Sequence, residues 1–203
     1  FDPANGWIET QKIQPANGDA GDRFAQSLSL EGKRLIIGTP GDDDKGLNAG
    51  AAYVFGKNQN GAFVQQHKIL DVALGTPGDE FGYCVSTRGD YVAIGAPSDD
   101  LKGKDAGAVH IFLRVDGGWI PVIALTQVGS RNLDHFGYSL QLQPGTLIAG
   151  TPGDDIGTQL DRGSVAIFEG LCSPSNSEQR ENELPTLPAV ALAKEGASVT
   201  LSP

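Results

Sequence analysis

The sequence has no methionine, two cysteines and three histidines, and its 15 basic residues are outnumbered by 25 acidic ones. The resulting net charge of −10 argues against a nucleic-acid partner, which requires a basic surface. No apolar run approaches the length of a bilayer span, so we expect no membrane insertion. Cys84 and Cys172 are too few for a disulfide framework. Because the sequence has no methionine and no signal-like start, we predict that Phe1 is a processed or excised terminus.

Helix signals are scarce as well, because 28 glycines and 12 prolines interrupt every candidate helical window. What the sequence has instead is one pattern written three times. The three copies cover residues 22–55, 79–112 and 134–168. Phe24, Phe81 and Phe136 stand at the same place in each copy, at an almost constant spacing. A fixed period of this length indicates a repeat architecture.

The middle copy predicts four strands. Residues 81–86 alternate large apolar with small or polar side chains, as a half-buried strand does. Residues 91–94 are mostly apolar and suit a strand covered on both faces, and Pro97 ends that strand. Further strands are predicted over residues 108–112 and 119–125. Four antiparallel strands in meander order form a propeller blade, so we predict an all-β fold of three blades.

The motif order within the copies is distinctive. A Phe-Gly, a strand, a Gly-Ala-Pro, an acidic loop and an aromatic-ended strand follow one another, for example from Phe81 through Gly95 to Phe112. This order resembles the FG-GAP repeat, which forms blades of β-propellers in integrin α-subunit heads and in many secreted bacterial proteins. The resemblance covers residues 6–170 and implies an extracellular or cell-surface protein.

The blade boundaries follow from the repeat. The predicted blades cover residues 14–70, 71–125 and 126–170, and residues 6–13 form an outer strand that completes another blade. The polar residues 171–188 are predicted to be a linker. Residues 189–203 predict two short strands and resemble the opening of a sandwich-type module.

The outer strands are offset by one along the chain. Residues 7–13 match the fourth strands at 63–69 and 119–125, whereas the third copy ends without such a strand. Three blades are too few to close a propeller ring, and an unpaired strand edge is a template for pairing with another chain. We therefore predict that residues 7–13 pair with the third blade of another copy, giving a six-bladed ring or an open assembly. The residues assigned to this contact are Trp7, Ile8, Ile13, Val165, Ile167 and Phe168. The alternative is that neighbouring blades of a larger chain precede Phe1.

Acidic residues recur on one predicted face of the blades. The recurring acids are Asp22, Asp42, Asp43, Asp79, Asp99, Asp100, Asp134, Asp154 and Asp155. Calcium takes six to eight oxygen ligands from such loops, so these acids are candidate metal ligands. The alternative is turn chemistry, in which each aspartate bonds nearby backbone. The Asp-x-Asp-x-Asp-Gly loop that holds calcium in integrin heads is not found here.

Two other motifs have ordinary structural interpretations. Arg88, Gly89 and Asp90 spell a tripeptide that many integrins bind, but they occupy the predicted turn between the first two strands. Trp7 and its counterparts at the start of each outer strand could stack glycans, as in propeller lectins. Recurring aromatics are more often blade-to-blade packing. We also expect that Cys84, a small core residue, and Cys172 are not bonded to each other.

Catalysis finds little support in the sequence. His67, His110 and His135 are not equivalent to one another, and none is near a nucleophile motif. Two classes of function remain open. The first is a non-catalytic binding or structural module of a surface, adhesive or filament-forming protein, with a carbohydrate-binding lectin as a variant. The second is the accessory propeller of a secreted phospholipase or hydrolase whose catalytic domain is outside this chain.

Overall fold

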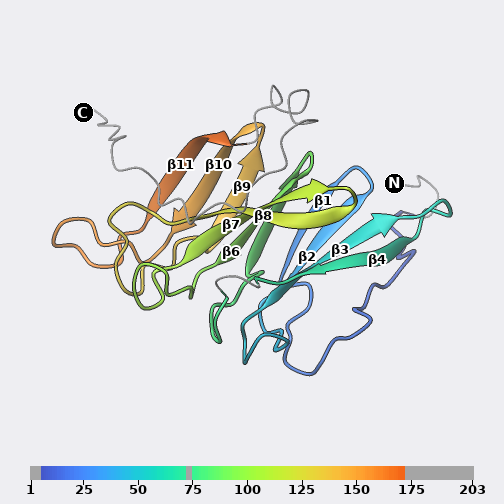
Figure 1. Ribbon diagram of the computed structural model, residues 1–203, viewed down its shortest axis with the longest axis horizontal. Helices are drawn as coiled ribbons and strands as arrows, with labels where there is room; N and C mark the ends of the chain where they lie inside the picture. Colours follow the sequence, from blue (N-terminus) through green and yellow to red (C-terminus); the bar gives the residue numbers. More distant parts are fainter. Residues whose placement is uncertain (1–5, 72–74, 172–203) are drawn as a thin grey trace.

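The computed structural model describes residues 6–71 and 75–171, which form three antiparallel sheets side by side (Figure 1). Blade 1 consists of β1 (Ser27–Glu31), β2 (Arg34–Thr39), β3 (Ala51–Lys57) and β4 (Phe63–Ile69). Blade 2 consists of β5 (Cys84–Arg88), β6 (Tyr91–Ala96), β7 (Ala108–Val115) and β8 (Gly118–Leu125). Blade 3 consists of β9 (Ser139–Gln143), β10 (Gly145–Thr151) and β11 (Ser164–Leu171). The prediction of an all-β fold with three blades is confirmed.

The strands differ from the prediction in two places. The first strand of each blade begins three residues after its phenylalanine, because the chain turns at that point. Glu80 and His135 have φ of 58° and 57°, a left-handed conformation that an extended strand does not contain. Residues 7–13 form no strand within this single chain, and their pairing with another copy stays a prediction. The predicted linker and sandwich strands beyond residue 171 lie outside the described residues.

The segment before blade 1 is held by side chains instead of a strand ladder. The amide of Gln11 brackets the backbone of Phe63, accepting its N–H at 2.9 Å and donating to its carbonyl at 2.8 Å. Ile13 packs with Phe24 against the buried Ile37 of blade 1. The segment therefore lies along β4 and covers part of one face of blade 1, the face that contains Ile37.

The Gly-Thr-Pro and Gly-Ala-Pro triplets are explained by the contact between blades. A Cβ on Gly38 of β2 would lie 1.9 Å from the carbonyl oxygen of Gly82, which belongs to the Phe-Gly of blade 2. A Cβ on Gly95 of β6 would lie 2.1 Å from the oxygen of Gly137 in blade 3. Since real side chains never approach backbone so closely, these positions require glycine.

A second glycine in each blade receives the phenylalanine of the next. The amide of Phe81 donates to the carbonyl of Ala49 at 3.0 Å, and a Cβ on Gly50 would lie 2.1 Å from the Phe81 oxygen. Phe136 stands in the same relation to Gly107, at 2.2 Å. We call the two glycines of a blade its Phe-Gly socket. The sockets are Gly38 with Gly50, Gly95 with Gly107, and Gly150 with Gly163.

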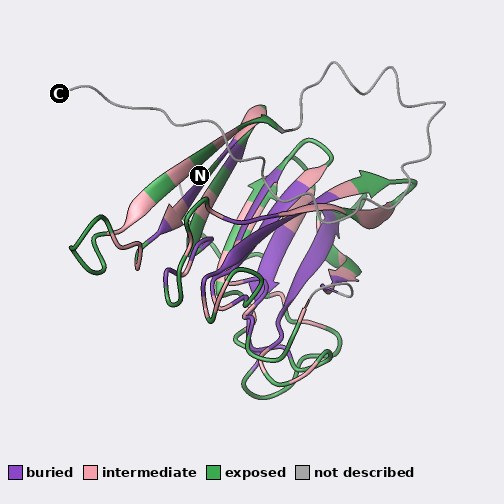
Figure 2. Ribbon diagram, turned by 60° about the vertical axis from the view of Figure 1, so that its left-hand side comes forward, coloured by how far each residue is buried: buried purple, intermediate pink, exposed green. Residues whose placement is uncertain are grey.

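The apolar cores lie between the blades. One core joins Ile36 and Val54 of blade 1 to Phe81 of blade 2, and another joins Ile111 of blade 2 to Phe136 of blade 3. Figure 2 shows the consequence: the middle strands are largely buried, whereas the outer ribbons of blade 3 carry exposed stretches. Among the described residues no helix has the length and apolarity to cross a bilayer.

Candidate functional site

The nine predicted metal ligands lie in loops at the same edge of the blades and form three sets of equivalent aspartates. In two of these sets all three aspartates make the same hydrogen bond. The aspartate before each phenylalanine accepts the backbone N–H three residues earlier, as in the 2.7 Å bond from Asp19 to Asp22. Asp79 and Asp134 accept from Thr76 and Arg131 in the same way. Burial and the nearby Asp99 raise the pKa of Asp79, while the Thr76 bonds oppose that rise. These carboxylates close turns.

The second aspartate of each pair spans its loop. Asp43 accepts the amide of Asn48, and Asp100 accepts the amide of Asp105, both at 2.7 Å. Asp155 does the same for the amide of Asp161 at 3.0 Å. The N–H donors come from the protein itself, which favours the turn interpretation. Calcium binding at these acids stays a prediction.

The first aspartate of each pair points into the blade and takes a different partner each time. Asp42 accepts from the hydroxyl of Tyr53 at 3.1 Å and pairs with the ammonium of Lys68 at 2.6 Å. In blade 3, Asp154 accepts from the amide of Gln127 at 3.0 Å. Each of these partners satisfies a carboxylate that would otherwise be costly to bury. In blade 2 the partner of the first aspartate is a buried histidine.

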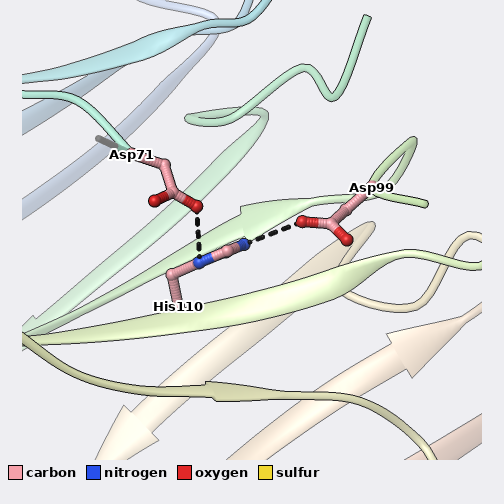
Figure 3. A group of neighbouring side chains, drawn as sticks. All are labelled: Asp71, Asp99 and His110. Atoms are coloured by element: carbon pink, nitrogen blue, oxygen red, sulfur yellow. Dashed lines mark hydrogen bonds and ion pairs between the residues drawn. The ribbon is translucent and has the colours of Figure 1, made fainter. Parts of the chain in front are cut away.

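In blade 2 the imidazole of His110 lies between two carboxylates (Figure 3). Its Nδ1 is 3.1 Å from Oδ2 of Asp71, and its Nε2 is 3.1 Å from Oδ2 of Asp99. The side chains of all three are at most 8% exposed. The ring of Phe81 meets the imidazole edge-on at 5.4 Å between centroids. Because Asp71 follows β4 of blade 1, this group connects blade 1 to blade 2.

The number of protons on the imidazole of His110 decides which hydrogen bonds this group makes. A neutral imidazole carries one N–H and can donate to one carboxylate, so donation at both ends requires the imidazolium form. Within the described residues, Asp71, Asp99 and His110 are also the one place where three potential ligand groups converge, and they could hold a metal ion. Both ring nitrogens face carboxylates in a buried position, so His110 presents no nitrogen to a substrate.

Asp99 was predicted from the sequence as a metal ligand, whereas Asp71 and His110 were not. A signal was present: His110 occupies the position of Tyr53, a polar tip on an otherwise apolar third strand. Asp71 occupies the position of Gln127, the residue that reaches Asp154 in blade 3. Comparing the polar residues across the copies would have indicated the group.

The Arg88, Gly89 and Asp90 turn is part of the junction between blades 1 and 2. Glu31 accepts the amide of Gly89 at 2.6 Å and lies 3.4 Å from the guanidinium of Arg88. Asp90 lies 3.5 Å from Arg34 of β2. The tripeptide is therefore engaged within the molecule, in agreement with its interpretation as a turn.

The remaining predicted residues are placed as follows. Trp7 and Ile8 are largely exposed, while Phe168 is half-buried against Phe136, with ring centroids 5.9 Å apart. Cys84 is half-buried on β5, and burial raises the pKa of its thiol. Cys172 lies outside the described residues, so the absence of a bond between the cysteines stays a prediction.

Three consecutive antiparallel sheets, packed face to face through Phe-Gly sockets, define a protein built of β-propeller blades. Residues 7–55 and 63–112 match the FG-GAP repeat, and the chain belongs to the FG-GAP repeat family. The matched segments begin at the aromatic residues Trp7 and Phe63 and end at Phe55 and Phe112, on the third strands of blades 1 and 2. No curated protein sequence matches the chain.

Proposed function

We propose that this chain is a non-catalytic, extracellular module of a surface, adhesive or filament-forming protein, and that it associates with a second copy of itself through its end blades. The observation that carries this proposal is the exposed apolar face of blade 3. In blades 1 and 2 the corresponding face is the one on which the next blade packs.

Equivalent residues differ sharply in exposure. Val109 and Ile111 of β7 are 0% and 1% exposed because blade 3 covers them. Their counterparts on β11, Val165 and Ile167, are each 64% exposed. Ile148, which is paired with Ile167 across the ladder, is exposed on the same face. Covering each of the two β11 side chains would contribute about 1.5–3 kcal/mol.

Blade 3 also keeps the features that receive a following blade. Gly150 and Gly163 preserve the socket that accepts a Phe-Gly in blades 1 and 2. β11 lies at one end of its sheet, and no described strand pairs with its outer edge, whereas β3 and β7 pair there with β4 and β8. An unpaired edge next to an apolar face is a template for another chain.

Blade 1 supplies a matching surface. Leu28 and Leu30 of β1 are about 60% exposed, although Val85, the counterpart of Leu28, is buried against blade 1. Ala25 stands where the later copies have Gly82, and a Cβ on Gly82 would lie 2.1 Å from a backbone oxygen of blade 1. We therefore propose that blade 1 of one copy docks on blade 3 of another and that Ala25 weakens this contact.

Sedimentation analysis over a range of protein concentrations tests the proposal. We expect reversible association, abolished by Ile167→Glu and strengthened by Ala25→Gly. Leu133→Glu is the matched control, because Leu133 is apolar and 52% exposed but lies in a loop outside the strands of this face. A chain that stays monomeric at high concentration, with or without Ala25→Gly, would refute association between copies.

A further inference from the structure

A basic cavity lies at the junction of blades 1 and 2, on the edge opposite the acidic loops. Its volume is about 190 Å³. The lining residues are Glu31, Lys33, Arg34, Gly56, Lys57, Gln66 and Arg114. Four of these side chains are cationic and one is anionic, in a protein whose net charge is −10. The cavity therefore has the opposite sign to the molecule as a whole.

Two of the four cations of the cavity lie over aromatic rings. Arg34 lies over the ring of Trp119, with 5.5 Å from its guanidinium carbon to the ring centroid, and Lys57 lies 5.7 Å over Phe63. Burial, and then repulsion from Arg114, lowers the pKa of Arg34. Positive charges are thus brought together with incomplete neutralisation, which an anion would relieve.

The carboxylates near the cavity already have partners. Glu31 accepts the amide of Gly89 at 2.6 Å and faces Arg88 on the neighbouring turn. Asp90 lies 3.1 Å from Nε of Arg114 and 3.5 Å from Arg34. One carboxylate therefore serves both arginines, and neither acid compensates the lysines of the cavity.

A comparison with blade 2 shows that the lysines are the unusual feature. In blade 2 the amide of Arg114 donates to the carbonyl of Asp90, and their side chains form an ion pair. In blade 1 the same backbone bond joins Lys57 to Lys33, at 2.8 Å. Two cations therefore occupy the positions that hold an opposite pair in the next blade. Like charges at neighbouring positions repel each other, and an anion between them offsets that repulsion.

Gly56 leaves room for the side chain of Gln66 at the cavity. A Cβ at this position would lie 2.2 Å from the side-chain nitrogen of Gln66, which extends across it. The counterpart of Gly56 in blade 2 is Leu113. The glycine therefore makes room for an amide donor beside the four cations.

We propose that this cavity binds a tetrahedral oxyanion, sulfate or phosphate, either as the free ion or as the charged group of a small molecule such as a sulfated sugar. Guanidinium groups match the geometry of such oxygens, and ammonium groups add point charges. Residues of blades 1 and 2 supply the whole lining of the cavity, so the site is complete within one copy.

Calorimetry at low ionic strength tests the site, with inorganic sulfate, inorganic phosphate, a sulfated monosaccharide and its unsulfated form as separate probes. We expect binding of the charged probes and none of the unsulfated sugar. Tighter binding of the sulfated sugar than of sulfate identifies a carried group as the ligand, and equal binding identifies the ion itself. Absence of heat and of any melting shift with all three anions would overturn the proposal.

The decisive variant is Lys33→Asp, which rebuilds in blade 1 the ion pair of blade 2. It should keep the fold, as checked by circular dichroism and melting, and weaken sulfate binding at least about tenfold. The matched control is Lys102→Asp, the same charge change at an exposed lysine in an acidic loop. Equal weakening by both variants would show a general charge effect and refute a specific site.

Discussion

The ammonium of Lys68 lies 2.6 Å from Oδ2 of Asp42, whose side chain is 2% exposed. The same ammonium lies 2.6 Å from Asp44, and its nitrogen is 5.2 Å from the ring centroid of Tyr53. We expect Lys68→Met to lower the free energy of unfolding by about 3 kcal/mol, because a buried carboxylate loses its counter-charge. Urea titration measures this change. A loss no larger than that of the exposed Lys12→Met would contradict it.

The same pair predicts a loss of stability at alkaline pH. Burial lowers the pKa of Lys68, but the bonds to Asp42 and Asp44 outweigh it and raise the pKa above 10.5. The contribution of the pair is therefore complete below pH 10.5 and is lost as the pH rises through the raised value. Burial, with the nearby Asp42, raises the pKa of Tyr53 to about 12, so its unfolded form ionises first and stability falls further. At pH values above the raised pKa of Lys68, the melting temperatures of the native protein and of Lys68→Met should converge.

The Phe-Gly sockets predict a cost for a single methyl group. Gly95→Ala would place a Cβ 2.1 Å from the oxygen of Gly137, so blade 3 must shift away from blade 2. We expect a loss of about 1–3 kcal/mol, as for overpacked cores. The control is Gly118→Ala, where the nearest atom lies at 3.6 Å and neither glycine has positive φ. Equal melting temperatures for the two variants would show that the socket does not require glycine.

The imidazole between two carboxylates predicts a strong dependence on His110. His110→Phe keeps a ring of similar size but leaves Asp71 and Asp99 without a shared donor. We expect a loss of about 3–5 kcal/mol in the free energy of unfolding. His67→Phe, on the exposed side of β4, should change stability little.

Addition of Zn²⁺ or Ni²⁺ to metal-stripped protein tests metal binding by Asp71, Asp99 and His110, because imidazole with carboxylates suits these ions. A metal-dependent rise in melting temperature should be absent in His110→Phe.

The acidic loops allow a direct test of calcium against turn chemistry. If the carboxylates act by accepting backbone N–H groups, Asp99→Asn with Asp100→Asn should weaken the loop equally with and without calcium. Turn chemistry alone predicts no binding heat and no melting shift of metal-stripped protein at millimolar calcium. Binding heat that disappears in the double variant would establish calcium ligation instead.

Strand donation by residues 7–13 makes a prediction about mass in solution. The structure shows Trp7 and Ile8 exposed, while Gln11 and Ile13 contact blade 1. A chain lacking residues 1–9 therefore keeps those contacts and loses the exposed aromatic end. We expect its association, measured by sedimentation, to be weaker than that of the full chain. Undiminished association would assign the contact to the blade faces alone.

Much of the fold was predictable because its causes are local. Alternating side chains specify half-buried strands, the apolar runs of β2 and β6 specify covered ones, and glycine turns connect them. The starts of β1, β5 and β9 were predicted too early, because the chain turns at a residue of positive φ before each phenylalanine, at Arg23, Glu80 and His135. Residues 7–13 match an outer strand in sequence, but within one chain the side chains of Gln11 and Ile13, and not a strand ladder, attach them to blade 1.

Three antiparallel blades of the FG-GAP type and the positions of the recurring aspartates could be read from the sequence, because each depends on residues near one another in the chain. The contacts of those residues could not, because they form between blades. The tertiary structure placed Asp71 of one blade and Asp99 of the next on either side of His110, and it brought Lys33 and Lys57 to one cavity. It also buried Val109 and left Val165 exposed, although both occupy the same place in the repeat. Burial and charge pairing depend on which blade packs against which, and no single repeat contains that information.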